Sequence, residues 1–298
     1  MPFLSHEGVS LRYDRAGSGP ALLLIHGWCS NRTFWERQVV ALRDRHTVIT
    51  VDLRGHGESS HPRSGYGIGS LAGDLEHLVR ALGVPRIAVV GWSMGGLVAQ
   101  ELAFRLGERA SALGLVCTTA GGLSDAKNPL AAAAAERTAA MKAQIAADFR
   151  GFVREFAPSI FKTGATFPLL PWVVGQLQKT PAHVAEACFD ALLAADLRER
   201  LGALRVPTAV FHGEGDALTP RSATDELVKG IKGATLTLFP ESGHAPMLEE
   251  PEAFNAALEK LLGHAGTGAE AATSRSTAAP KPTPAPRAKS PKKAPRRK

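Results

Sequence analysis

Short apolar runs alternate with longer segments of helical periodicity along most of this chain, and no other feature restricts the fold as strongly. Apolar and β-branched residues fill the strand-length runs at 21–27, 46–52, 86–93, 112–119 and 207–214. Strands that are apolar on both faces are typical of a parallel sheet with helices on both sides. The sequence therefore predicts an α/β fold with a mostly parallel central sheet and right-handed helical crossovers.

The remaining elements of this sheet follow from the same patterns. Residues 3–8 and 9–17 predict a hairpin at the start, and residues 234–241 predict the last strand. The spacing of apolar residues predicts helices over 33–44, 70–83, 94–107 and 249–262. Ser70 is a candidate N-cap for the second of these helices, and Gly83 is a stop signal.

The alternation is interrupted between Gly121 and about Ala203. This segment is rich in alanine, contains no β-rich run, and carries several phenylalanines and Trp172. It predicts helices inserted between two core strands as a cap. The predicted organisation is a core of residues 1–120 and 204–263, a helical cap of residues 121–203, and a tail of residues 264–298.

The tail carries most of the chain's excess positive charge. Nine of the 35 Lys and Arg residues, but only one acidic residue, lie in residues 264–298. The rest of the chain is close to neutral, so the net charge of +7 does not indicate a nucleic-acid-binding fold. Six prolines and no large apolar residue between 280 and 298 predict a disordered tail. Two interpretations stay open: a solubilising extension, or a contact with an anionic partner such as nucleic acid or an acidic protein.

The segment Gly91-Trp92-Ser93-Met94-Gly95 has the spacing G-x-S-x-G and joins a predicted strand to a predicted helix. In a nucleophile elbow of this kind, a sharp strained turn lifts the serine hydroxyl above the sheet edge. Small residues at Gly91 and Gly95 let the turn pack, and the helix N-terminus favours developing negative charge. Ser93 is therefore the candidate nucleophile, and the alternative is an ordinary glycine-rich turn.

A serine nucleophile needs a base, because its hydroxyl is a poor nucleophile near pH ~7. His244 follows the last predicted strand, which places it at the same sheet edge as Ser93. His26 and His56 lie in loops at this edge and are the rival bases. We expect these two to hold loops through ring hydrogen bonds instead.

The base in turn needs an acid that fixes its tautomer. Asp216 follows the run at 207–214 and is the candidate acid. Glu214 and the more remote Asp125 are its rivals.

Two backbone N–H groups are the candidate oxyanion donors. Met94 follows the nucleophile, and Trp28 lies in the loop after the first apolar run, where Gly27 permits a tight turn. Cys29, next in this loop, is expected to pack rather than to react.

Four motifs, taken in chain order, resemble the α/β-hydrolase superfamily. They are His26-Gly27-Trp28, the run DLRGHGES at 52–59, the elbow at 91–95, and Gly243-His244 followed by Pro246, Glu249 and Pro251. The order Ser93, Asp216, His244 is also that of this superfamily. The resemblance covers residues 1 to about 263 and implies the α/β-hydrolase fold. It says much less about the substrate than about the fold, because proteins with this fold catalyse many different reactions.

Within the superfamily, the chain resembles the carboxylesterases related to pimeloyl-carrier-protein methyl ester esterase. The resemblance lies in HGW at 26–28, GWSMGGLVA at 91–99, the short helical cap, and AADLRERL at 194–201. Enol-lactonases and cofactor-free perhydrolases share much of this pattern. Perhydrolases are expected to carry proline after HGW, where this chain has Cys29. Serine rather than aspartate at the elbow argues against haloalkane dehalogenases and epoxide hydrolases.

These features predict a serine hydrolase that cleaves carboxylic esters through an acyl-enzyme, with Ser93, His244 and Asp216 as a catalytic triad. The alternatives are a lactone or C–C bond hydrolase, or a perhydrolase, that uses the same residues. An alternative from another class is a non-catalytic binding protein that keeps the fold.

The candidate substrate-binding side chains are Trp28 and Trp92 from the core and Phe152 and Phe156 from the cap, because ligand sites are mostly apolar. Residues 137–179 carry six basic residues and two acids. A basic outer face of the cap would suit an acidic carrier protein with a bound ester, as the resemblance implies. The alternative is a small-molecule ester and a cap whose charges are simply solvated.

The sequence contains no C-x-x-C, no H-E-x-x-H, no P-loop and no dinucleotide fingerprint, so no cofactor and no metal are expected. Three widely spaced cysteines argue against a disulfide framework. No run reaches the ~18 apolar residues of a membrane helix, and the N-terminus lacks the pattern of a signal peptide. We therefore expect a cytoplasmic protein without a membrane segment.

Overall fold

The computed structural model of the protein describes residues 2–122 and 129–276. One eight-stranded sheet has the strand order β1-β2-β4-β3-β5-β6-β7-β8. The strands are β1 (Phe3–His6), β2 (Val9–Ala16), β3 (Ala21–Ile25), β4 (Thr47–Val51), β5 (Ile87–Trp92), β6 (Ala110–Val116), β7 (Thr208–Gly213) and β8 (Thr235–Phe239). The pairs β1–β2 and β2–β4 are antiparallel and all other pairs are parallel, so the prediction of a mostly parallel sheet is confirmed.

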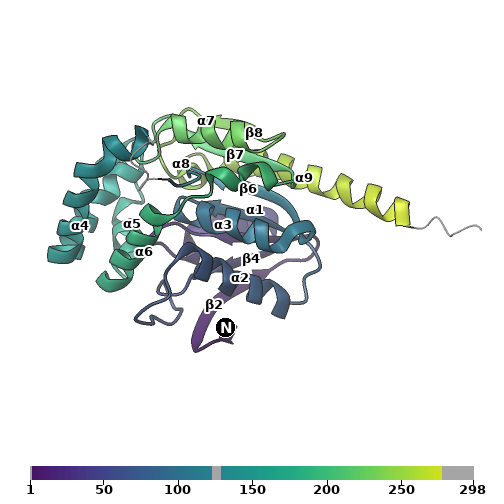
Figure 1. The fold of residues 1–298 in the computed structure, drawn as a ribbon, viewed down its shortest axis with the longest axis horizontal. Helices are drawn as coiled ribbons and strands as arrows, with labels where there is room; N and C mark the ends of the chain where they lie inside the picture. The colour runs from purple at the N-terminus through teal and green to yellow at the C-terminus, as the bar shows by residue number, and fades with distance from the viewer. Residues whose placement is uncertain (1, 123–128, 277–298) are drawn as a thin grey trace, which may run out of the picture.

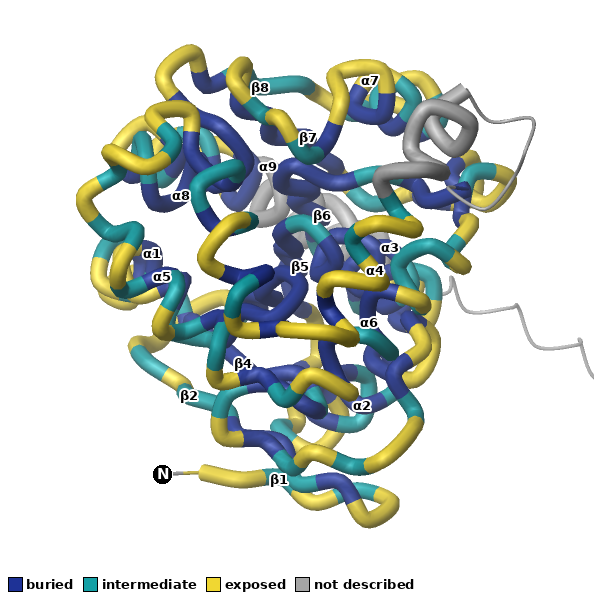
Figure 2. Tube along the Cα trace, turned by 90° about the vertical axis from the view of Figure 1, so that its left-hand side faces the viewer, coloured by how far each residue is buried: buried dark blue, intermediate teal, exposed yellow. Residues whose placement is uncertain are grey.

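Helices cover this sheet, as its buried strands require. All residues of β4 and β5 are buried, which is possible only where both faces of the sheet are covered. The described helices outside the segment between β6 and β7 are α1 (Glu36–Leu42), α2 (Ile68–Ala81), α3 (Met94–Leu106), α7 (Arg221–Gly230), α8 (Pro246–Glu249), α9 (Pro251–Ser276) and the 3-10 helices η1 (Arg32–Trp35) and η2 (Gly107–Arg109). α2 packs on α3, whereas α1 contacts α8 and α9. Figure 2 shows the core as dark blue tube through the central strands.

The helix α2 begins earlier than the sequence predicts. Its N-cap residue is Gly67, whose backbone is extended, and Ser70 lies inside the first turn. The prediction of Ser70 as the cap is therefore wrong. The physical reason is that Ile68, the first helical residue, is buried against the core, so packing favours an earlier start.

Between β6 and β7 the chain forms a group of helices, which we call the helical insertion (residues 129–203). It contains α4 (Pro129–Phe156), α5 (Leu170–Leu177), α6 (Ala182–Ala194) and the 3-10 helices η3 (Ala157–Ile160), η4 (Gly164–Thr166) and η5 (Arg198–Ala203). Figure 1 shows α4, α5 and α6 together at one end of the sheet. Asp148 interrupts α4 with a non-helical backbone, and its carboxylate accepts a hydrogen bond from Gly151 N at 2.9 Å, as an N-cap does. We interpret this arrangement as a core and a cap.

The last helix continues past Gly263, where the sequence predicts that the tail begins. α9 extends to Ser276, and Figure 1 shows its end projecting away from the sheet. The alanines at 265, 269, 271 and 272 favour helix in this stretch. The predicted disorder and anionic partner concern a tail whose residues 277–298 lie outside the described residues.

None of the helices in the described part of the chain has the length and hydropathy of a membrane-spanning segment.

Candidate active site

Ser93 lies in a strained turn between β5 and α3. Its backbone has φ of 56° and ψ of −121°, a region that residues other than glycine rarely adopt. A Cβ atom at Gly91 would lie 2.0 Å from Gly95 O, and one at Gly95 would lie 2.4 Å from His26 O. Only glycine fits at these two positions, so both glycines of the motif are required by the turn.

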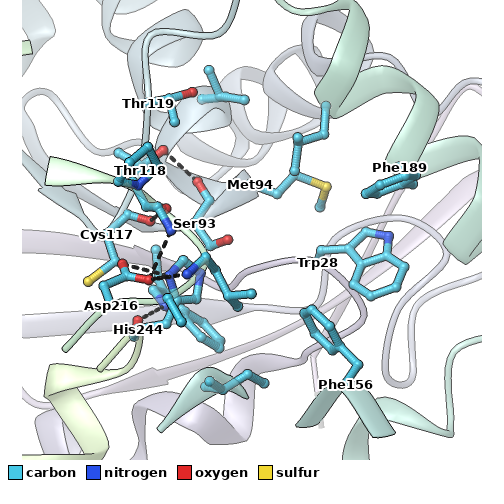
Figure 3. A pocket seen from close by; sticks show the side chains of 18 of the residues that line it. Trp28, Ser93, Met94, Cys117, Thr118, Thr119, Phe156, Phe189, Asp216 and His244 are labelled. Carbon is cyan, nitrogen blue, oxygen red and sulfur yellow. Dashed lines mark hydrogen bonds and ion pairs between the residues drawn. The ribbon is translucent and has the colours of Figure 1, made fainter. Parts of the chain in front are cut away.

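Hydrogen bonds hold the backbone of this turn against the neighbouring strand. Ser93 N donates to Val116 O at 2.9 Å, and Gly96 N donates to Ser93 O at 2.8 Å. The hydroxyl of Thr118 also donates to Ser93 O, at 2.7 Å. With its peptide fixed in this way, Ser93 lines a cavity, as Figure 3 shows.

His244 and Asp216 are in direct contact, although they come from the ends of different strands. Nδ1 of His244 lies 3.0 Å and 2.9 Å from the two carboxylate oxygens of Asp216. The Asp216 side chain is completely buried, and it also accepts hydrogen bonds from the amides of Leu218 and Thr219 at 2.8 Å and 2.9 Å. His244 and Ser93 line the same cavity (Figure 3).

The environment of Asp216 keeps its carboxylate ionised. Burial alone raises the pKa, but the charge and hydrogen bond of His244 and the two backbone amides outweigh it, so the pKa lies below its usual value. An ionised carboxylate accepts the proton of Nδ1–H, which leaves Nε2 of His244 as the basic nitrogen.

None of the described rival acids and bases lines the cavity of Ser93 and His244. Glu214 is exposed, and Asp125 lies outside the described residues. Nδ1 of His26 lies 2.8 Å from Gly27 O, and its Nε2 accepts a hydrogen bond from Leu53 N at 3.0 Å. Nδ1 of His56 lies 3.0 Å from Arg54 O. The expectation that these two histidines hold loops through ring hydrogen bonds is confirmed.

The two loop histidines should make the protein sensitive to mild acid. Burial lowers the pKa of His26 to about 4 and that of His56 to about 3. In the unfolded chain each protonates near its ordinary pKa of about 6.5, so the unfolded state binds more protons as the pH falls. Between about pH 6 and pH 4, each histidine should lower the free energy of unfolding by at most roughly 1.4 kcal/mol per pH unit.

Urea unfolding at a series of pH values measures this slope. His56→Gln should reduce the slope of the unfolding free energy against pH by the contribution of one histidine, because glutamine cannot protonate in the unfolded chain. A wild-type stability that stays constant over this pH range would contradict the prediction.

The loop after β3 carries one predicted oxyanion donor and lies against the turn at Ser93. A Cβ at Gly27 would approach the Trp92 ring to 3.1 Å and Ser93 Cβ to 3.2 Å. Trp28 follows Gly27 and lines the cavity together with Met94, the first residue of α3. Both residues predicted to donate to the oxyanion are thus beside Ser93.

The Trp28 side chain connects this loop to the helical insertion. Its Nε1 donates to Ala185 O at 2.9 Å. Four aromatic rings of the insertion surround it at centroid distances of 5.7 to 6.4 Å: Phe149, Phe152, Phe156 and Phe189. The loop and the insertion therefore pack as one unit.

Three of the four predicted substrate-binding residues line the cavity: Trp28, Trp92 and Phe156. Phe152 is buried, stacks on Phe156 at 5.4 Å, and is not among the described residues that line the cavity. Phe189 of α6 does line it, although only its aromatic character within a helical segment pointed to it. Packing of the insertion, rather than aromatic type, decides which ring reaches the cavity.

The cavity has a volume of about 460 Å³ and a mainly apolar wall. Its polar lining residues include Ser93, Asp216, His244 and four threonines, namely Thr118, Thr119, Thr138 and Thr219. Figure 3 shows Trp28, Phe156 and Phe189 on one side of Ser93, and Cys117 with Asp216 and His244 on the other. An apolar concavity with a few convergent polar groups is typical of a small-molecule site.

Cys117 completes a group of ligand-type atoms with Asp216 and His244, all within 4.8 Å of one another. Burial raises the pKa of this thiol well above its ordinary value, so it stays protonated near neutral pH. Its Sγ lies 3.8 Å from Gly243 O. The thiol is protonated and Nδ1 of His244 is bonded to Asp216, so these three residues form part of a hydrogen-bonded network in this structure.

The motif at 52–59 supports the site from outside the cavity. Buried Asp52 accepts hydrogen bonds from the backbone of Arg32 at 2.8 Å and of Glu58 at 2.9 Å, and from the Arg32 guanidinium at 2.6 Å. Gly57 has φ of 54°, and a Cβ there would lie 2.3 Å from the Asp52 carboxylate. Asp52 thus joins the loop after β4 to the segment that follows the loop after β3.

Comparisons with known proteins agree with this geometry. Residues 20–251 match the family model described as alpha/beta hydrolase fold. A pimeloyl-[acyl-carrier protein] methyl ester esterase of Nitrosomonas europaea is 31% identical over 258 residues, which are 85% of this chain and 100% of the relative. The 3-oxoadipate enol-lactonase 2 of Acinetobacter baylyi is 31% identical over 263 residues, with 87% and 95% coverage.

The solved structure of an esterase from Exiguobacterium antarcticum matches with a TM-score of 0.80 and 26% identity, over 87% of this chain and 97% of that one. These alignments cover 85–87% of this chain and nearly the full length of each relative, and the solved esterase shares the fold. Because the family model spans most of the chain, the protein belongs to the α/β-hydrolase family.

Proposed function

We propose that the protein is a serine hydrolase that cleaves carboxylic esters through an acyl-enzyme. The observation that carries this proposal is the strained turn at Ser93, which opens into the same cavity as a histidine bonded to a buried carboxylate. In the proposed reaction, Nε2 of His244 takes the Ser93 proton as Oγ attacks the ester carbonyl carbon. Asp216 holds the ring and stabilises the imidazolium charge.

The tetrahedral intermediate then collapses to an acyl-enzyme. Its oxyanion would be held by the amides of Met94, at the N-terminus of α3, and Trp28. The imidazolium returns its proton to the departing alkoxide, which leaves as the alcohol. A water molecule, deprotonated by His244, then attacks the acyl carbon and releases the acid with regeneration of Ser93.

The cavity supports an uncharged and largely apolar group next to the reacting carbonyl. Four aromatic side chains and the side chains of Met141, Leu192 and Leu193 form much of its wall. A lactone is a second candidate substrate, because an enol-lactonase is as similar to the chain as the methyl ester esterase is. The same groups would open a lactone ring, with the alkoxide staying attached to the acyl chain.

Stoichiometric labelling by a fluorophosphonate tests this proposal, because that reagent traps an activated serine. We expect one label per chain, located at Ser93 by peptide mass spectrometry. A panel of esters of increasing acyl length, with matched lactones, should then be compared by kcat/KM. A folded protein that takes no label and hydrolyses none of these substrates would be a binding protein instead.

The exposed arginines of α4 test whether a carrier protein presents the ester. Arg150 and Arg154 lie on the surface of the helical insertion. If an acidic carrier docks there, Arg150→Glu with Arg154→Glu should raise KM several-fold for a carrier-bound ester but not for the free ester. The rise in KM for the carrier-bound ester should become smaller at high salt, because salt screens the attraction between surface charges.

Arg86→Glu is the matched control, because Arg86 is exposed and precedes β5, at the opposite edge of the sheet from Ser93. Arg86→Glu should change KM for neither the carrier-bound nor the free ester. An equal effect of the α4 reversal on both esters would mean that these charges do not recognise a carrier, and the protein would then act on small esters.

A further inference from the structure

Glu249 contacts the backbone on both sides of His244. Its carboxylate accepts hydrogen bonds from Gly243 N at 2.8 Å and from Ala245 N at 3.3 Å, both through Oε2. Its other oxygen, Oε1, accepts one from Lys162 N at 2.7 Å. Lys162 belongs to the helical insertion, so a single side chain binds the loop of the proposed base and a segment 87 residues away in sequence.

The same two segments also meet directly. His244 N donates to Ile160 O at 2.7 Å. A Cβ at Gly243 would lie 2.7 Å from Lys162 N and 2.8 Å from Ile160 O, so the backbones are too close for any side chain there. The His244 peptide is therefore packed against residues 160–162, and Glu249 bridges the amides on either side of this contact.

The adjacent Glu250 provides a natural comparison. It is half-buried like Glu249, and its carboxylate binds Ser242 Oγ at 2.6 Å and Glu241 N at 3.0 Å. These partners precede Gly243 and do not include the neighbours of His244. Two successive glutamates thus stabilise one loop, but only Glu249 binds the peptides next to the proposed base.

We propose that Glu249 is a positioning residue, which holds His244 in line between Asp216 and Ser93 and joins that alignment to the docking of the helical insertion. This role rests on the proposed function, since it takes His244 as the base. Hydrogen bonds from amides to a carboxylate are charge-assisted and stronger than those to a neutral oxygen. A shift of about 1 Å in a reacting group can cost on the order of a hundredfold in rate, so loosening this loop should act on turnover.

The test compares Glu249→Gln with Glu250→Gln. Glutamine keeps the size of the side chain but replaces one accepting oxygen by an NH₂ group, which cannot accept from the amides. We expect Glu249→Gln to lower kcat for a small soluble ester by roughly 10- to 100-fold, with little change in KM, because Glu249 is outside the cavity wall. Glu250→Gln should stay close to the wild-type kcat. Glu249→Asp, which keeps the charge but reaches less far, should fall between the two.

Proton NMR tests the position of His244 without measuring turnover, and it can be applied to a variant that is folded but less stable than the wild type. The Nδ1 proton between His244 and Asp216 should give a downfield signal in the wild type, which is assigned by its loss in Asp216→Ala. We expect this signal to shift or broaden in Glu249→Gln and to be retained in Glu250→Gln.

Several outcomes would overturn the positioning role. They are a folded Glu249→Gln protein with wild-type kcat, equal losses in both glutamine variants, or an unchanged Nδ1 signal in Glu249→Gln. A wild-type protein that neither labels at Ser93 nor hydrolyses esters contradicts the proposed function instead, and the NMR comparison would still test whether Glu249 positions His244.

Discussion

Replacing Ser93 with alanine should lower ester hydrolysis by roughly 10³-fold or more and leave the fold intact. The loss follows from removing the Oγ that would form the acyl-enzyme, while the proposed oxyanion donors and the cavity remain. Stability should change little, because alanine has the same backbone strain as serine at φ of 56° and adds no atoms to the turn. Steady-state kcat on a soluble ester and the melting temperature measure the two effects.

The exposed Ser222 in α7 offers a control for this experiment. Ser222→Ala should keep both the turnover and the fluorophosphonate label, whereas Ser93→Ala should lose both. A folded Ser93→Ala protein that hydrolyses esters near the wild-type rate would rule out the acyl-enzyme route through this residue.

Replacing Asp216 with asparagine should lower kcat on the order of 10⁴-fold, with a smaller effect on KM. The asparagine amide would present a donor to Nδ1 of His244, which favours the tautomer with the proton on Nε2. That nitrogen could then no longer accept the Ser93 proton, and the imidazolium would lose its stabilising charge. The fold should persist, because the asparagine oxygen can still accept from the amides of Leu218 and Thr219.

Glu214 is the matched control, because it lies two residues before Asp216 in the same loop and was its rival as the acid. Glu214→Gln should leave kcat within about twofold of the wild type, as expected for an exposed surface substitution. A larger loss in Glu214→Gln than in Asp216→Asn would reverse the assignment of the acid.

The sequence by itself determined the features that depend on local chemistry. Runs such as ALLLI and IAVV specify buried parallel strands, because only a sheet covered on both faces removes such segments from water. Gly91 and Gly95 specify the turn at Ser93, because their backbones approach other backbone atoms too closely for a Cβ. Each of these features leaves a short sequence pattern that can be read directly, although the atoms that exclude a Cβ at Gly95 belong to Ile25 and His26 at the end of β3.

Only the tertiary structure decided the features that depend on contacts between distant segments. The sequence analysis names Asp216 as the acid with Glu214 as its rival, and the turn after β7 is what brings Asp216 to His244 and leaves Glu214 exposed. Phe152 and Phe156 lie one helical turn apart, yet Phe156 reaches the cavity and Phe152 packs behind it. Nothing local to residues 246–251 indicates that Glu249 binds the amide of Lys162, because such contacts arise from the packing of the insertion onto the core and leave no periodic trace in the sequence.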